Sequence, residues 1–122
     1  MADGVSIAMW SGPRNISTAM MYSFDNRKDC FASDEPLYAH YLARTGIKHP
    51  DADVVMAHHE TDAATVVDYL TGEIPGSAGV WYQKHMCHHI IPEMETGWLD
   101  SLHNCFLIRN PREVLLLSLI HI

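Results

Sequence analysis

Three short polar segments of this chain, residues 11–18, 84–89 and 109–112, carry side chains suited to binding an anion. They hold four of the eight basic residues: Arg14, Lys84, Arg109 and Arg112. The chain as a whole is acidic, with 15 Asp and Glu residues and a formal net charge of −7. Because so acidic a chain still gathers its cations in a few segments, we expect it to bind an anionic small molecule there.

The first segment, residues 11–18, reads Ser-Gly-Pro-Arg-Asn-Ile-Ser-Thr and separates an apolar run from a helical pattern. Backbone N–H groups at a helix start lack intrahelical partners and, with the helix dipole, favour an anion, so the amides of residues 15–18 are candidate donors. Ser17 and Thr18 add hydroxyl groups, and the Arg14 guanidinium suits phosphate or sulfate. The Lys of a Walker A loop is missing. A capped helix with an exposed Arg is the alternative interpretation of this segment.

Two residues are candidates for the base that a group transfer requires, Glu35 and His85. An imidazole has an ordinary pKa better suited to taking a proton at neutral pH than a carboxylate has, so we slightly favour His85. An alternative is that His85, Cys87 and His89 share one face of a strand and bind a metal. Their spacing matches no standard zinc pattern, and we expect no metal.

The composition is that of a soluble globular domain, with 48% hydrophobic and 19% charged residues over 122 positions. It excludes a disordered, collagen-like or coiled-coil chain, and the negative charge excludes a general nucleic-acid binder. Three widely spaced Cys residues do not suggest a disulfide framework, which favours reduced thiols and a cytoplasmic location. We find no targeting pattern and no apolar run of the ~20 residues that span a bilayer, so we expect no membrane association.

The hydrophobic pattern predicts alternating strands and helices. We expect strands at residues 5–10, 30–33, 79–86 and 104–108. We expect helices at residues 16–27, 37–44, 62–70 and 91–102, another starting at Pro111, and a loop at 46–53. This alternation favours an α/β fold with a parallel sheet and crossover helices, its first and last strands side by side. Ligands of such sheets bind beyond the carboxyl ends of the strands, which is where the polar segments fall.

Two segments resemble signatures of the sulfotransferase superfamily. Residues 13–18, with the pattern Pro-Arg-x-x-Ser-Thr between a strand and a helix, are similar to its phosphosulfate-binding loop. Residues 106–113, Phe-Leu-Ile-Arg-Asn-Pro-Arg-Glu, are similar to the strand and Arg that hold the 3′-phosphate of the donor. Residues 34–41 and 82–86 further resemble segments of bacterial sulfotransferase-like proteins.

The resemblance implies a three-layer fold like that of P-loop NTPases, and sulfuryl transfer from 3′-phosphoadenosine 5′-phosphosulfate to a hydroxyl or amine of a small acceptor. It implies that Arg14 stabilises the leaving phosphate, and that Glu35 or His85 is the base. The residues implied to bind the donor are Pro13, Arg14, Asn15, Ile16, Ser17, Thr18, Arg109 and Ser118. Ile16 replaces a usual Gly, and Ser118 lies one position after the place of the family's Ser.

The superfamily's domain is longer than this chain. The two signature segments lie near opposite ends of the chain, so they bracket most of it. We therefore expect residues 1–122 to be the N-terminal part of a single sulfotransferase-like domain, with residues 117–122 a non-native tail. Two alternatives are a P-loop small-molecule kinase and a nucleotide-binding module without turnover. Magnesium dependence separates the kinase from the sulfotransferase, and turnover separates both enzymes from the binding module.

Overall fold

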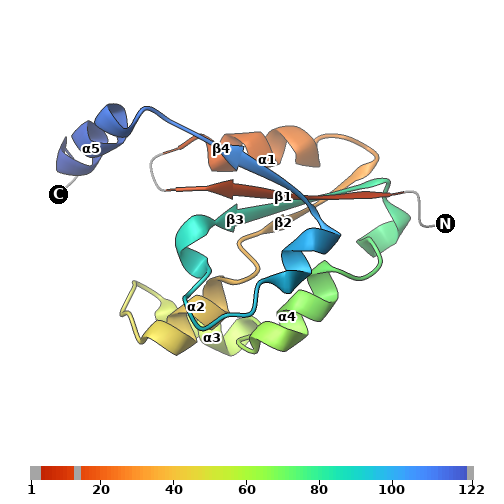
Figure 1. Cartoon of the computed structure of the whole chain (residues 1–122), viewed down its shortest axis with the longest axis horizontal. Helices are drawn as coiled ribbons and strands as arrows, with labels where there is room; N and C mark the ends of the chain where they lie inside the picture. The colour runs from red at the N-terminus through yellow and green to blue at the C-terminus, as the bar shows by residue number, and fades with distance from the viewer. Residues whose placement is uncertain (1–3, 13–14, 121–122) are drawn as a thin grey trace.

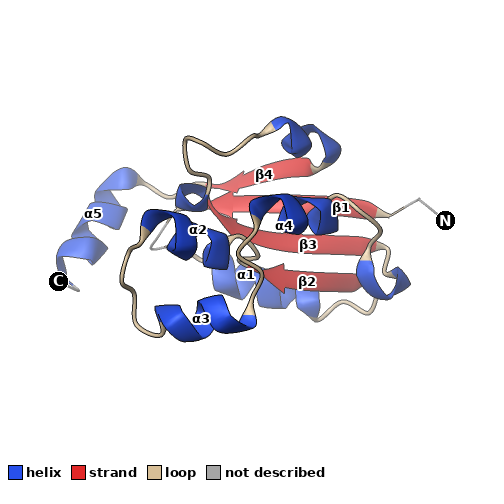
Figure 2. Ribbon diagram, turned by 90° about the horizontal axis from the view of Figure 1, so that it is seen from below, coloured by secondary structure: helices blue, strands red, loops and turns tan. Residues whose placement is uncertain are grey.

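The computed structural model describes residues 4–12 and 15–120, so the predicted site residues Pro13 and Arg14 lie outside the described residues. Four strands form an all-parallel sheet in the order β2-β3-β1-β4 (Figure 2). The strands are β1 (Val5–Ser11), β2 (Cys30–Asp34), β3 (Val80–Met86) and β4 (His103–Leu107). The predicted α/β fold, its four strands and the pairing of the first strand with the last are confirmed.

Helices lie on both faces of the sheet, which gives three layers (Figure 1). One face is covered by α1 (Ser17–Asp25) and the other by α2 (Tyr38–Thr45), α3 (Ala52–His58) and α4 (Ala63–Leu70). The last helix, α5 (Pro111–Ile120), extends away from the sheet. No helix in the described part of the chain is long and apolar enough to cross a membrane.

One helix was not predicted, and one helix prediction was wrong. No helix was predicted at α3, which begins at Ala52, within the predicted loop of residues 46–53. Its Ala52, Val55 and Met56 are half-buried and none of its residues is fully buried, so its apolar face is short. Residues 91–102 were expected to be a helix, but only Gly97–Ser101 are helical, in a 3-10 turn. Pro92 and Gly97 interrupt that stretch, and both residue types disfavour a continuous helix. Two further 3-10 turns span Pro75–Ser77 and Cys87–His89.

Side chains of β3 alternate between the two layers, as strand geometry requires. Gln83 faces the layer of α4 and donates a hydrogen bond from Nε2 to the Leu70 carbonyl at 3.1 Å. Tyr82 faces α1, where its ring stacks on Phe24 with centroids 4.4 Å apart. The alternation puts His85 in the α4 layer with Gln83, and Lys84 on the α1 side with Tyr82. The strand therefore delivers neighbouring polar residues to opposite sides of the sheet.

The apolar core lies between the sheet and the α2–α4 layer. It consists of Ala8, Trp10, Leu37, Val66, Leu70, Trp81, Trp98 and Leu102. Asp62 caps the start of α4, because its Oδ2 accepts a hydrogen bond from the Thr65 N–H at 3.1 Å. The core and the cap together fix the layer that supports the carboxyl ends of β2 and β3.

Candidate functional site

The loop between β1 and α1 is tied to the end of β4. Asn15 donates a hydrogen bond from Nδ2 to the Leu107 carbonyl at 3.2 Å, and its Oδ1 accepts one from the Ile16 N–H at 2.8 Å. Asn15 and Leu107 are 92 positions apart in the sequence. One amide side chain thus brings the two segments with superfamily signatures together at the same edge of the sheet.

The first turn of α1 presents part of the predicted anion site. Within the described residues, the backbone N–H groups of Ser17 and Thr18 have no hydrogen-bond partner. The N–H of Ile16, predicted to be free as well, is instead occupied by Asn15. Ser17 is 7% exposed, whereas the Ile16 side chain is 59% exposed. The amides of Ser17 and Thr18 and their hydroxyl groups remain the candidate donors here.

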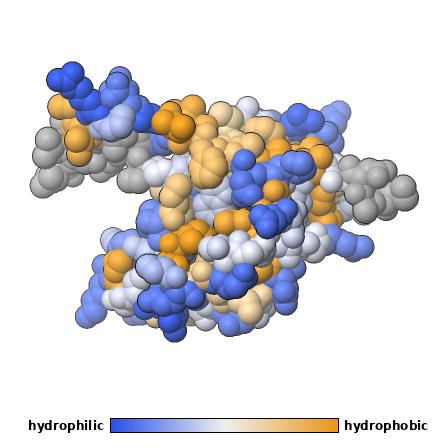
Figure 3. Space-filling view, in the orientation of Figure 1, coloured by the Kyte–Doolittle hydropathy of each residue, from blue (hydrophilic) through white to orange (hydrophobic). Residues whose placement is uncertain are grey.

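Beyond β4, the chain turns directly into α5. Arg109 lies 3.3 Å from Glu113, measured from Nε to Oε2, at i,i+4 spacing. The Asn110 side chain accepts a hydrogen bond from the Arg112 N–H at 2.9 Å. Ser118 lies on α5, but its side chain is outside the described part of the structure. Exposed apolar residues accompany these polar ones over β4 and α5 (Figure 3): Phe106, Ile108, Leu115 and Leu116.

The ends of β2 and β3 carry a buried lysine between two carboxylates. Lys84 Nζ lies 2.8 Å from Glu35 Oε2 and 3.2 Å from Asp34 Oδ1, and the Lys84 side chain is 6% exposed. Burial alone would lower the pKa of Lys84, but the hydrogen bond and charge of Glu35, with those of Asp34, outweigh it and raise the pKa. Lys84 is therefore a fixed cation that holds the Glu35 carboxylate.

Glu35 occupies a strained position at the mouth of a cavity. Its φ is +48°, in the left-handed region that side chains other than Gly, Asn and Asp seldom adopt. Its N–H donates to the Lys84 carbonyl at 2.9 Å, and its side chain is 27% exposed. The cavity, hereafter the Glu35 cavity, has a volume of about 510 Å³ and is also lined by Tyr38, His49 and His89. That volume suits a small molecule.

Histidine and tyrosine rings form one wall of the Glu35 cavity. Tyr38 Oη lies 2.9 Å from His49 Nδ1, and the Tyr38 ring stacks on His89 with centroids 5.3 Å apart. Burial, with His88, Lys84 and His49 nearby, lowers the pKa of His89 to about 4. His89 is therefore neutral at pH 7, and its 3.8 Å contact with Glu35 is a polar contact and not an ion pair.

His85, the slightly favoured base, lies inside the core. It is 0% exposed, its Nε2 is 3.1 Å from Gln83 Oε1, and its ring stacks on Trp10 with centroids 4.4 Å apart. Its Nδ1 has no partner among the described residues. Burial, with His89 nearby, lowers the pKa of His85 to about 3. The geometry favours Glu35 as the base, because only Glu35 reaches the cavity.

The three residues of the alternative metal cluster do not converge. β3 ends at Met86, so Cys87 and His89 lie in a 3-10 turn and not on the strand face of His85. Cys87 is exposed, whereas His85 and His89 are buried. Over the described ranges, no three His, Cys, Asp or Glu side chains are grouped as metal ligands.

Sequence reasoning did not identify the pair of Glu35 with Lys84, or the ring wall of Tyr38, His49 and His89. The available signal was Lys84 itself, a lysine within a strand otherwise suited to burial. A buried lysine requires a partner, and the neighbouring strand offers Asp34 directly opposite it.

Comparison with known proteins identifies the family of this chain. A family model described as a sulfotransferase domain matches residues 5–118. Branched-chain-amino-acid aminotransferase-like proteins 1 and 2 of Arabidopsis thaliana are 37% and 36% identical to this chain. The matches cover 94% and 89% of this chain but 20% and 19% of those proteins, so the chain spans about a fifth of their length. No solved structure matches the chain significantly.

Proposed function

The chain belongs to the sulfotransferase domain family, and from this premise we propose that it transfers a sulfuryl group from 3′-phosphoadenosine 5′-phosphosulfate to a hydroxyl or amine of a small acceptor. The observation that supports this most is the hydrogen bond from Asn15 to the Leu107 carbonyl. It joins the two segments that would bind opposite ends of one nucleotide. A phosphosulfate loop and a 3′-phosphate site must lie at one sheet edge for this function.

In this proposal the donor is bound at two places. The loop of Pro13, Arg14, Asn15 and Ile16, with Ser17 and Thr18 at the start of α1, binds the 5′-phosphosulfate through amides, hydroxyls and a guanidinium. Arg109 binds the 3′-phosphate and exchanges its contact with Glu113 for the ligand, with Ser118 adding a hydroxyl group. The 5′-phosphosulfate thus meets amides that have no partner among the described residues, and the 3′-phosphate replaces a surface contact of Arg109.

Transfer takes place between the loop and the Glu35 cavity. Glu35 accepts the proton of the acceptor as the acceptor oxygen or nitrogen attacks sulfur. The bond from sulfur to the bridging phosphate oxygen breaks, leaving adenosine 3′,5′-bisphosphate, and Arg14 stabilises the charge on that phosphate. Lys84 keeps the Glu35 carboxylate in place through its 2.8 Å contact. The neutral rings of Tyr38 and His89 provide a wall for the acceptor.

Calorimetric titration tests the choice of nucleotide. Adenosine 3′,5′-bisphosphate should bind without Mg²⁺ and more tightly than ATP does. Tighter binding of ATP that depends on Mg²⁺ would instead support the small-molecule kinase. Binding of the bisphosphate without any sulfuryl transfer to a panel of alcohols, phenols and amines would support the module without turnover.

The base is tested with Glu35→Gln, which keeps the shape of the side chain and removes its negative charge. We expect turnover to fall by about 10²- to 10⁴-fold, while bisphosphate affinity is unchanged. Glu73→Gln is the matched control, because Glu73 is exposed and lines a different cavity with Gly4 and Ser6, at the amino-terminal end of β1. If Glu35→Gln retained full turnover, Glu35 would not be the base.

A further inference from the structure

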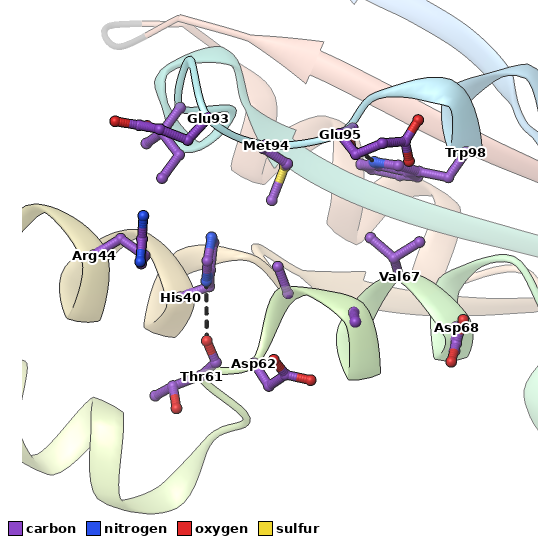
Figure 4. A pocket seen from close by; sticks show the side chains of 13 residues that line it. His40, Arg44, Thr61, Asp62, Val67, Asp68, Glu93, Met94, Glu95 and Trp98 are labelled. Carbon is purple, nitrogen blue, oxygen red and sulfur yellow. Dashed lines mark hydrogen bonds between the residues drawn. The ribbon is translucent and has the colours of Figure 1, made fainter.

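A second cavity lies between α2, α4 and residues 91–98 (Figure 4). Its volume is about 550 Å³, within the range of small-molecule sites. Neighbouring residues of α2 line the two cavities, since Ala39 lines the Glu35 cavity and His40 lines this one. We refer to it as the His40 cavity, and the sulfuryl transfer proposed above does not use it.

The middle of the His40 cavity is apolar. Met94 and Val67 extend into the space from opposite sides, and Trp98 lies near them (Figure 4). The Trp98 indole N–H is already used, because it donates to the Glu95 carbonyl at 2.8 Å. The Trp98 ring is therefore available as a surface for contact and not as a hydrogen-bond donor. These walls suit a hydrocarbon or aromatic group.

His40 supplies a hydrogen-bond acceptor that lacks a donor. The residue is 7% exposed, and its Nδ1 lies 3.0 Å from the Thr61 carbonyl. Because a carbonyl oxygen only accepts, Nδ1 carries the proton and Nε2 presents a lone pair. Nε2 has no partner among the described residues and points toward the segment that carries Met94 (Figure 4). Nε2 is not one of the buried polar atoms that lack a partner, so it is open to the cavity, where a ligand with an N–H or O–H group can donate to it.

The charges around the His40 cavity select a cation. Its lining includes one guanidinium, that of Arg44. It also includes four carboxylates: Asp62, Asp68, Glu93 and Glu95. Such an excess of negative charge repels an anion and attracts an ammonium group, which can also lie against the face of an indole.

We propose that the His40 cavity binds an organic ammonium ion, an amine with a hydrocarbon or aromatic portion. The ammonium group donates a hydrogen bond to His40 Nε2 and is attracted by the carboxylates, of which Glu93 and Glu95 lie on the 91–98 segment. The apolar portion packs between Met94, Val67 and Trp98. Each of the three features of the cavity then has a matching part of the ligand.

The test uses 2-phenylethylamine as the probe and the indole N–H signal of Trp98 as the readout, assigned with Trp98→Phe. We expect saturable shifts of that signal, and binding at least about tenfold tighter than that of 3-phenylpropionate, which has the opposite charge. Trimethyl(2-phenylethyl)ammonium keeps the charge without an N–H donor, so it should bind several-fold more weakly than the amine.

The matched variants are Glu93→Gln combined with Glu95→Gln, both on exposed residues, and Glu73→Gln outside the cavity. The double variant should weaken 2-phenylethylamine binding by about five- to tenfold, and the control should leave it unchanged. The proposal is overturned if the amine produces no shift at millimolar concentration, if 3-phenylpropionate binds equally well, or if the double variant binds the amine unchanged. None of these readouts involves sulfuryl transfer, so that function can fail independently.

Discussion

Acid should unfold this protein through two histidines that are buried in the neutral state. The pKa of His85 is lowered from an ordinary 6.5 to about 3, and that of His89 to about 4, in both cases mainly by burial. Below pH 6.5 the unfolded chain binds protons at these positions that the folded chain does not. Burying these histidines in the neutral form therefore leaves the free energy of unfolding unaffected above pH 6.5. That free energy falls as the pH drops from 6.5 toward the folded pKa values.

The size of the effect follows from the proton count. Each histidine contributes a slope that approaches about 1.4 kcal/mol per pH unit once its unfolded form is fully protonated. Over the window from pH 6.5 to 4.5, the pair together lowers the free energy of unfolding by about 4 kcal/mol. The pKa values of Asp29 and Asp62 are lowered from 3.8, mainly by side-chain hydrogen bonds from Arg27 and Thr65 respectively, so these carboxylates act below this window.

Urea unfolding between pH 7 and 4.5, followed by tryptophan fluorescence, measures this slope. His85→Gln should remove about half of it, and His58→Gln, at an exposed position, should remove none. If His85→Gln does not fold, NMR titration of the unmodified protein gives the same information, because the His85 ring should stay neutral down to pH 4.5. A stability that is flat across the window, or a His85 ring that titrates near pH 6.5, would refute the reasoning and restore His85 as a candidate base.

Three further predictions concern the donor site and the core. Arg14→Ala should lower kcat by about 10²-fold or more, whereas Arg109→Ala should mainly raise the KM for the donor, both measured as initial rates. Asn15→Ala should weaken adenosine 3′,5′-bisphosphate binding by about three- to tenfold in calorimetry, because it frees the loop from β4, while Asn26→Ala at the far end of α1 should not. Leu37→Ala, at a fully buried position, should lower the free energy of unfolding by about 2–5 kcal/mol in urea.

The strands could be predicted from the sequence because each is an apolar or alternating run with a turn signal on at least one side. Ser11-Gly12-Pro13 begins at the last residue of β1, and Asp34-Glu35-Pro36 begins at the last residue of β2, so both signals mark the strand ends within one residue. The helix α3 could not be predicted in this way, because it begins after the left-handed Asp51 without a side-chain cap and buries none of its residues. A helix of seven residues with neither a capping side chain nor a fully buried residue leaves only a weak pattern in the sequence.

The candidate site could be predicted as a set of residue types but not as a set of accessible groups. Glu35 and His85 both follow or end strands, and spacing alone does not distinguish the half-exposed carboxylate from the buried imidazole. The difference arises from alternation along β3, which turns His85 toward Trp10 and Trp98 and turns Lys84 toward Glu35. How deeply each of these side chains is buried depends on helices from distant parts of the chain that pack on the sheet. The burial of His85 therefore could not be predicted from the local sequence.

The strand order has a consequence for the way this protein is made. β1 is synthesised first, but it pairs with β3 and β4, and the Trp10 indole donates to Asn104 Oδ1 across 94 positions of sequence. A growing chain therefore carries β1 without either partner until β3 emerges from the ribosome. The hydrogen bond from Asn15 to the Leu107 carbonyl cannot form until Leu107 has been added. Sheets closed by such distant contacts fold slowly, and an unpaired apolar strand is prone to aggregation in the meantime. We expect the nascent chain to depend on chaperones up to about the point at which β4 is complete.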